Sequence, residues 1–135
     1  MTADVLRGVL AAMAMTGVRS LTTRLGIVRL TPPDELGRHG AGASLLKLVP
    51  PEQRGAVLEV AHWTYGALGG AVFALLPHRA RSSKAVGTAY GLALWAVFEA
   101  AVAPVAGADR ERPIEERAAL AADHVLYGLV LTSGR

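Results

Sequence analysis

The pattern His-x-x-Tyr-Gly occurs twice in this sequence, once beginning at His62 and once at His124. Each copy lies within an otherwise apolar segment. An imidazole ring changes its charge near neutral pH, and its nitrogens also bind metals. Residues three and four apart lie on one face of a helix, so each histidine would share a face with its tyrosine and glycine. The two copies therefore predict equivalent polar positions on two helices.

Further ionisable residues extend this predicted polar site. Glu59 comes one helical turn before the first histidine, and Asp123 directly precedes the second. Arg19 and Glu99 lie about 15 residues into other apolar segments, which places all of these groups at a similar depth. We expect Arg19 to be the fixed cation, with Glu99 or Asp123 as its partner. The expected buried polar cluster consists of Arg19, Glu59, His62, Tyr65, Glu99, Asp123, His124 and Tyr127.

The distribution of charge indicates the helices that would position this cluster. No Asp, Glu, Lys or Arg occurs from Val60 to Pro77, and only Glu99 interrupts Ala85 to Ala108. Both segments reach the roughly 17–25 residues that a membrane-spanning helix needs. Two shorter apolar segments lie nearer the chain ends. The sequence thus predicts one all-α domain over residues 1–135, a four-transmembrane-helix bundle with helices at about 5–28, 51–76, 85–104 and 113–133.

Helix boundaries follow from proline and from capping residues. Asp4 is the expected N-cap of the first helix, and Pro51 suits the first turn of the second. Pro77 should end the second helix, and Pro113 should open the fourth. Within the long first connection, residues 43–49 could form a short amphipathic piece in the membrane interface.

Small residues predict where the helices pack. Each copy of the repeated pattern falls in the second helix of a two-helix hairpin, so two parallel hairpins would be related by a pseudo-two-fold axis along the membrane normal. Glycines at small-xxx-small spacing favour close helix contacts over a wide pore. The expected packing positions are Gly8, Gly66, Gly70, Gly87, Gly91 and Gly128.

Loop charge predicts the orientation. The loop between the second and third helices carries Arg79, Arg81 and Lys84 without an acid, whereas the loop before Pro113 mixes both signs. By the positive-inside tendency, that basic loop and both termini are cytoplasmic. We therefore attribute the net charge of +3 to membrane topology and to contacts with lipid headgroups. The sequence lacks the alternation of aromatic and basic residues that is typical of nucleic-acid-binding surfaces.

Four segments together resemble a known group. "MTGVRSLTTRLGIVRLTPP", "HWTYGALGG", "GTAYGLALWAVFEAAVAP" and "DHVLYGLVL" are similar to the YagU-like small bacterial inner-membrane proteins of unknown function. The resemblance covers most of the chain through short motifs. It implies a multi-helix protein of the bacterial inner membrane, and it implies no reaction and no catalytic residue.

Two functions fit the predicted polar layer. The first is proton or ion handling, or pH sensing, because histidine titrates near neutrality and neighbouring carboxylates tune it. The second is a structural or accessory subunit that packs against a larger membrane complex or against itself as a homo-oligomer, with the polar layer holding the helices together. In both cases the lipid bilayer is the surrounding partner.

A haem or metal site at His62 and His124 is a lesser alternative. Glu59 and His62 have the ExxH spacing of carboxylate-bridged metal bundles, but the position equivalent to Glu59 is Ala121, and the tyrosines crowd both histidines. The sequence has no phosphate-binding glycine loop, no HExxH and no recognisable nucleophile, so no catalytic residue is assigned. A soluble four-helix domain remains an alternative, because the first and fourth helices are marginal spans.

Overall fold

The computed structural model describes residues 2–26, 40–106 and 113–133, and within these ranges the chain is helical without any strand. The prediction of an all-α helical bundle is therefore confirmed. Four long helices are α1 (Thr2–Arg24), α4 (Arg54–Phe73), α6 (Lys84–Val97) and α8 (Ile114–Thr132). The shorter elements are α3 (Gly40–Leu46), the 3₁₀ helix η1 (Pro51–Gln53), α5 (His78–Arg81), the π-helix η2 (Phe98–Val102) and α7 (Ala103–Ala106).

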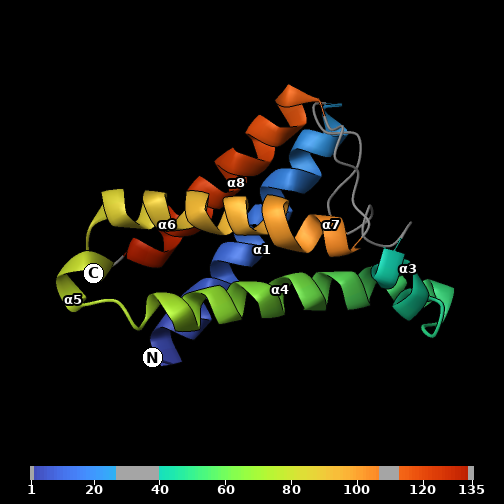
Figure 1. The fold of residues 1–135 in the computed structure, drawn as a ribbon, viewed down its shortest axis with the longest axis horizontal. Helices are drawn as coiled ribbons and strands as arrows, with labels where there is room; N and C mark the ends of the chain where they lie inside the picture. Colours follow the sequence, from blue (N-terminus) through green and yellow to red (C-terminus); the bar gives the residue numbers. More distant parts are fainter. Residues whose placement is uncertain (1, 27–39, 107–112, 134–135) are drawn as a thin grey trace.

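The four long helices form two hairpins joined along one side. Helix α1 packs against α4, α6 packs against α8, and α1 also packs against α8. Figure 1 shows α4 and α6 with roughly parallel axes and opposite chain directions, with α1 crossing behind both of them and α8 crossing behind α6. Helices α4 and α6 have no comparable packing contact with each other. The side of the bundle between α4 and α6 is therefore the loosest part of the described fold.

Glycines allow the helices of each hairpin to cross at backbone contact. A Cβ atom added to Gly8 would collide with the carbonyl oxygen of Gly66, and one added to Gly91 would collide with the carbonyl oxygen of His124. Only a residue without a side chain fits at such a crossing, and the close approach increases dispersion contacts between the helices. The glycines selected by their spacing all lie at these two crossings: Gly8, Gly66, Gly70, Gly87, Gly91 and Gly128.

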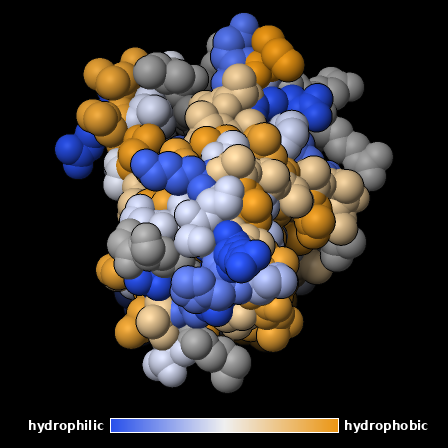
Figure 2. All heavy atoms as spheres, turned by 90° about the vertical axis from the view of Figure 1, so that its left-hand side faces the viewer, coloured by the Kyte–Doolittle hydropathy of each residue, from blue (hydrophilic) through white to orange (hydrophobic). Residues whose placement is uncertain are grey.

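Large apolar side chains are exposed on the surface of the bundle, while several charged side chains are buried inside it. Leu10 of α1 is 59% exposed and Leu68 of α4 is 61% exposed, whereas Arg19 is only 5% exposed. In a water-soluble domain, charged residues are almost never fully buried unless they are paired, and large exposed apolar surfaces are rare. Viewed on the end that carries α5, hydrophilic side chains gather in the middle of the face with hydrophobic side chains beside them (Figure 2).

One helix in the described part of the chain, Lys84–Val102, is long and apolar enough to cross a membrane by length and composition. The sequence predicts four such helices, so the structure supports this expectation only for the third. The other three long helices contain 23, 20 and 19 residues. At 1.5 Å per residue, these helices are about 34, 30 and 28 Å long, comparable to the hydrocarbon thickness of a bilayer.

The start of α1 differs from the expected capping arrangement. Asp4 is not the N-cap, because α1 begins at Thr2 and Asp4 lies within its first turn, where its side chain is buried. Its carboxylate accepts a hydrogen bond from Arg81 Nη1 in α5 at 3.2 Å, and Arg7 Nη1 lies 3.8 Å away. A tertiary ion pair therefore fixes the start of α1 to the connection between α4 and α6.

The other helix ends largely follow the proline pattern. Pro51 opens η1, which leads directly into α4, and Pro113 precedes α8. Ser83 caps α6 by accepting a hydrogen bond from Val86 N at 3.4 Å, a cap the sequence analysis did not identify. The first helix ends at Arg24, earlier than the expected residue 28, because Leu25 and Gly26 form a turn in which Gly26 has a φ of 72°; residues 27 and 28 lie outside the described residues. The third helix extends two residues beyond Pro104, because η2 and α7 continue it to Ala106.

Candidate polar cavity

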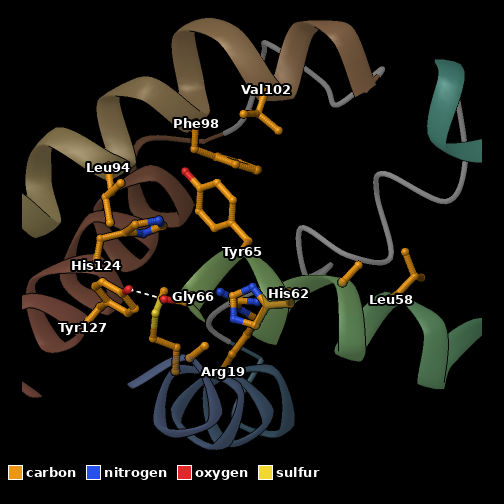
Figure 3. A pocket seen from close by; sticks show the side chains of 13 residues that line it. Arg19, Leu58, His62, Tyr65, Gly66, Leu94, Phe98, Val102, His124 and Tyr127 are labelled. Carbon is orange, nitrogen blue, oxygen red and sulfur yellow. Dashed lines mark hydrogen bonds between the residues drawn. The ribbon is translucent and has the colours of Figure 1, made fainter. Parts of the chain in front are cut away.

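A cavity of about 210 Å³ lies between the four long helices, at the level of the predicted polar layer. Figure 3 shows its walls, with α1 and α4 on one side and α6 and α8 on the other. Most of the lining is apolar, and Arg19 is its one charged side chain in the part of the chain that the structure describes. The lining residues are Ala12, Met15, Arg19, Leu58, Ala61, His62, Tyr65, Gly66, Leu94, Phe98, Val102, His124 and Tyr127.

Arg19 is held at the cavity by Asp123. Arg19 Nε lies 3.5 Å from Asp123 Oδ2, and the two side chains are 6% and 10% exposed. Of the two partners that the sequence left open for Arg19, Asp123 is the one the structure brings to it. A buried charge is tolerated only when it is paired or hydrogen-bonded, so this ion pair joins α1 to α8.

The two histidines line the same cavity from α4 and α8 (Figure 3). His124 Nδ1 lies 2.8 Å from the Leu120 carbonyl oxygen, one turn earlier in α8. A carbonyl oxygen only accepts, so Nδ1 carries the proton and Nε2 of the neutral ring is an acceptor. His62 Nε2 is buried and has no hydrogen-bond partner. An unsatisfied buried polar group of this kind costs about 1–3 kcal/mol.

The two tyrosines of the repeated pattern differ in their contacts. Tyr127 OH donates a 2.5 Å hydrogen bond to the Gly66 carbonyl oxygen, which joins α8 to α4. Tyr65 OH is buried without a hydrogen-bond partner. Figure 3 shows the Tyr65 ring reaching from α4 toward Phe98 and His124. The cavity therefore holds two polar atoms, His62 Nε2 and Tyr65 OH, whose hydrogen-bonding capacity is unused.

A third tyrosine contributes to the same region and was missed by the sequence analysis. Tyr90 OH of α6 donates a 2.6 Å hydrogen bond to the Gly69 carbonyl oxygen of α4. This bond links α4 and α6, and the ring of Tyr90 also packs against that of Phe73 in α4, with ring centroids 5.0 Å apart. The signal was present, because Tyr90 precedes Gly91 and so repeats the Tyr-Gly dipeptide found at Tyr65 and Tyr127.

The π-helix η2 shapes the upper wall of the cavity. Proline has no N–H and its ring collides with the preceding turn, so Pro104 disfavours regular α-helical hydrogen bonds just before it. The wider turn of η2 is the local solution, and π-turns of this kind often lie at functional sites. Phe98 and Val102 both project from η2 into the cavity lining (Figure 3).

The structure places two members of the predicted cluster away from the cavity. Glu59 Oε2 accepts a 3.0 Å hydrogen bond from Thr16 Oγ1 and does not line the cavity. Glu99 lies 3.9 Å from Arg117 Nε, and its side chain is 21% exposed. The six other members gather here: Arg19, His62, Tyr65, Asp123, His124 and Tyr127.

The cavity does not fit a haem or a metal ion well. Within residues 2–26, 40–106 and 113–133, no three His, Asp or Glu side chains are grouped closely enough to hold a metal. Ligand pockets usually measure about 300–1,000 Å³, so a cavity of about 210 Å³ is small even for an ordinary ligand and too small for a porphyrin. The ring of Phe98 also contacts His124, with centroids 6.4 Å apart, and occupies space beside that histidine.

Comparisons of the chain with protein-family models, with curated proteins and with solved structures gave no match.

Proposed function

We propose that this chain is a small integral membrane protein, a four-helix bundle whose buried cavity responds to protonation of its histidines. The observation that carries the proposal is the placement of His62 and His124 in one cavity with the buried Arg19–Asp123 ion pair. The likeness to the YagU-like group agrees with an inner-membrane location and stays part of the proposal.

The membrane part of the proposal rests on the inverted distribution of polarity. Leu6, Leu10 and Leu21 lie on the outward face of α1, while its inward face holds Asp4 and Arg19. Lipid accommodates such an outer surface, and ionisable residues in membrane bundles face the interior, where they pair with one another. Glycine crossings and tyrosine–carbonyl hydrogen bonds provide the association energy that apolar burial cannot provide between helices in lipid.

The protonation response follows from charge. Arg19 is the charged side chain of the cavity lining, and its positive charge already needs Asp123. A proton on either histidine adds a second positive charge in an apolar space, where like charges repel strongly. Acidification should therefore loosen α4 and α8 against α1. The apolar side chains between the polar groups favour sensing over conduction.

Tryptophan fluorescence tests this proposal, because Trp63 and Trp95 lie on α4 and α6. In lipid nanodiscs, we expect a reversible change in emission as the pH is lowered. His62→Gln and His124→Gln should each reduce it strongly. His78→Gln is the matched control, because His78 lies exposed in α5, and it should leave the change intact. An unaltered response in both cavity variants would refute the protonation site.

The alternative of a structural or accessory subunit is favoured by a separate observation. The polar groups Arg19, Asp123 and Tyr127 all bridge two helices. If the cavity variants lose helical content, as measured by circular dichroism, the polar layer holds the bundle together and senses nothing. Chemical crosslinking in native membranes would then identify the neighbouring chain, which is either a second copy or a larger complex.

A further inference from the structure

A second hollow, of about 360 Å³, adjoins the cavity along the gap between α4 and α6. Tyr65 and Leu94 line both hollows. Its other lining residues are Leu68, Gly69, Val72, Tyr90, Ala93 and Val97. Among the residues that the structure describes, the second hollow adds one hydroxyl, on Tyr90, and this hydroxyl already donates a hydrogen bond to the Gly69 carbonyl oxygen. The two hollows together therefore have a polar inner end and an apolar outer end.

The inner end offers hydrogen bonds and positive charge. His62 Nε2 and Tyr65 OH are buried without a partner, and both belong to residues of the inner lining. Arg19 supplies the charge of this lining while remaining paired with Asp123. The Tyr65 hydroxyl is a hydrogen-bond donor beside a cation, and such a donor recognises an anionic oxygen more strongly than a neutral one. A carboxylate is a small group of this kind.

The outer end suits a single hydrocarbon chain. From Tyr65 to Val72 the second hollow follows α4 for about 10 Å. Leu68, Val72 and Val97 are more than half exposed, so the hollow is open along the bundle surface. Bilayer lipid surrounds that surface if the proposed function holds. An amphiphile could then pass sideways from the bilayer, with its head reaching the cavity and its tail lying between α4 and α6.

We infer that the two adjoining hollows bind one long-chain fatty acid, with its carboxyl group at Arg19, His62 and Tyr65 and its chain along the groove between α4 and α6. The inference rests on the membrane location in the proposed function. The inner cavity admits a carboxyl head, and the single groove between α4 and α6 suits one hydrocarbon chain rather than the two chains of a phospholipid. The carboxyl group of the occupant also supplies a hydrogen-bond acceptor to Tyr65 OH. It bonds to His62 Nε2 when either the carboxyl group or the imidazole ring carries the proton between them, and these contacts remove the cost of leaving both atoms unsatisfied.

Native mass spectrometry of the delipidated protein in detergent tests the inference with three probes of equal chain length. Palmitate should bind saturably as one molecule per chain. Hexadecanol should bind at least about tenfold more weakly, because a neutral head does not exploit the charge of Arg19, and hexadecyltrimethylammonium should not bind. Dipalmitoylphosphatidylglycerol tests whether an anionic phospholipid with two chains, rather than a fatty acid, is the occupant. Equal binding of all three single-chain probes, or saturable binding of the phospholipid in preference to palmitate, would overturn the inference.

A matched pair of tryptophan substitutions locates the site. Leu94 lines both hollows, whereas Leu92 lies two residues away and is exposed outside both linings. Leu94→Trp should fill the passage and abolish palmitate binding, and Leu92→Trp should leave it unchanged. Tyr65→Phe should weaken binding without changing helical content. Retained binding in Leu94→Trp contradicts the site. The pH response without fatty acid is a separate readout, so loss of palmitate binding alone leaves the proposed function standing.

Discussion

Tyr127 and Tyr65 occupy equivalent positions in the repeated pattern, yet only Tyr127 has a hydrogen-bond partner. Removing the hydroxyl in Tyr127→Phe should therefore lower the free energy of unfolding by about 0.5–1.5 kcal/mol. The identical change in Tyr65→Phe removes a buried hydroxyl that bonds to nothing, so stability should stay the same or rise slightly. Unfolding of the delipidated protein by SDS titration measures both. Equal destabilisation by the two variants would show that the Tyr127 hydrogen bond has no special role.

The sequence identified most of the residues at the cavity, and the reasons for its errors are physical. The position of a residue along its helix predicts its level in the bundle. On this basis the sequence correctly placed Arg19, His62 and His124 together, and all three line the cavity. Depth does not determine rotation about the helix axis, so Glu99 was grouped with them although it faces Arg117. The Asp4–Arg81 pair joins residues 77 positions apart, and no local pattern indicates a contact of that kind.

At the scale of the helices, glycine at a crossing and glycine on a free face should behave in opposite ways. A Cβ on Gly91 would collide with the His124 carbonyl, so Gly91→Ala must separate α6 from α8 and should destabilise the bundle by about 1–3 kcal/mol. Gly17 of α1 has nothing within 4 Å of an added Cβ. Gly17→Ala should therefore stabilise the bundle by about 0.5–1 kcal/mol through helix propensity.

Thermal unfolding followed by circular dichroism in detergent measures this pair of alanine variants. Opposite shifts in the melting temperature are expected. If both variants shift in the same direction, α6 and α8 do not cross at close contact.

The spacing of glycines was enough to predict the crossings, because close helix packing needs small residues at one helical face. The π-turn η2 was not predictable in the same way, since Pro104 alone is equally compatible with a helix end.

At the scale of the whole molecule, the two hairpins have similar helix contacts within each hairpin, but the contacts between the two hairpins are not symmetric. Gly66 faces Gly8 in the first hairpin as its counterpart Gly128 faces Gly87 in the second. A strict two-fold axis would make the contact of α4 with α6 match that of α1 with α8. Instead α1 and α8 pack closely, and the hollows open between α4 and α6. The asymmetry places the access to the cavity on one side of the bundle.

The number of membrane crossings determines which parts of the chain share a side. With four crossings, Ser82 and Ser133 lie on the cytoplasmic side and Gln53 on the opposite side. If only Lys84–Val102 crosses, Gln53 and Ser82 share a side and Ser133 lies opposite them. In a soluble domain, no membrane separates the three positions. All three residues are exposed at the ends of helices, and the chain contains no cysteine, so single cysteines can report on each side.

We expect four crossings, because α1 and α4 expose large hydrophobic side chains such as Leu10 and Leu68, and because the buried Arg19 of α1 faces the interior of the bundle, where it pairs with Asp123. A membrane-impermeant maleimide added to intact spheroplasts should therefore label Gln53→Cys alone. Ser82→Cys and Ser133→Cys should react only after the membrane is disrupted, since the basic loop holding Arg79 and Arg81 favours the cytoplasmic side. Labelling in which Ser82→Cys follows Gln53→Cys would reduce the protein to a single span and place its polar cavity in water.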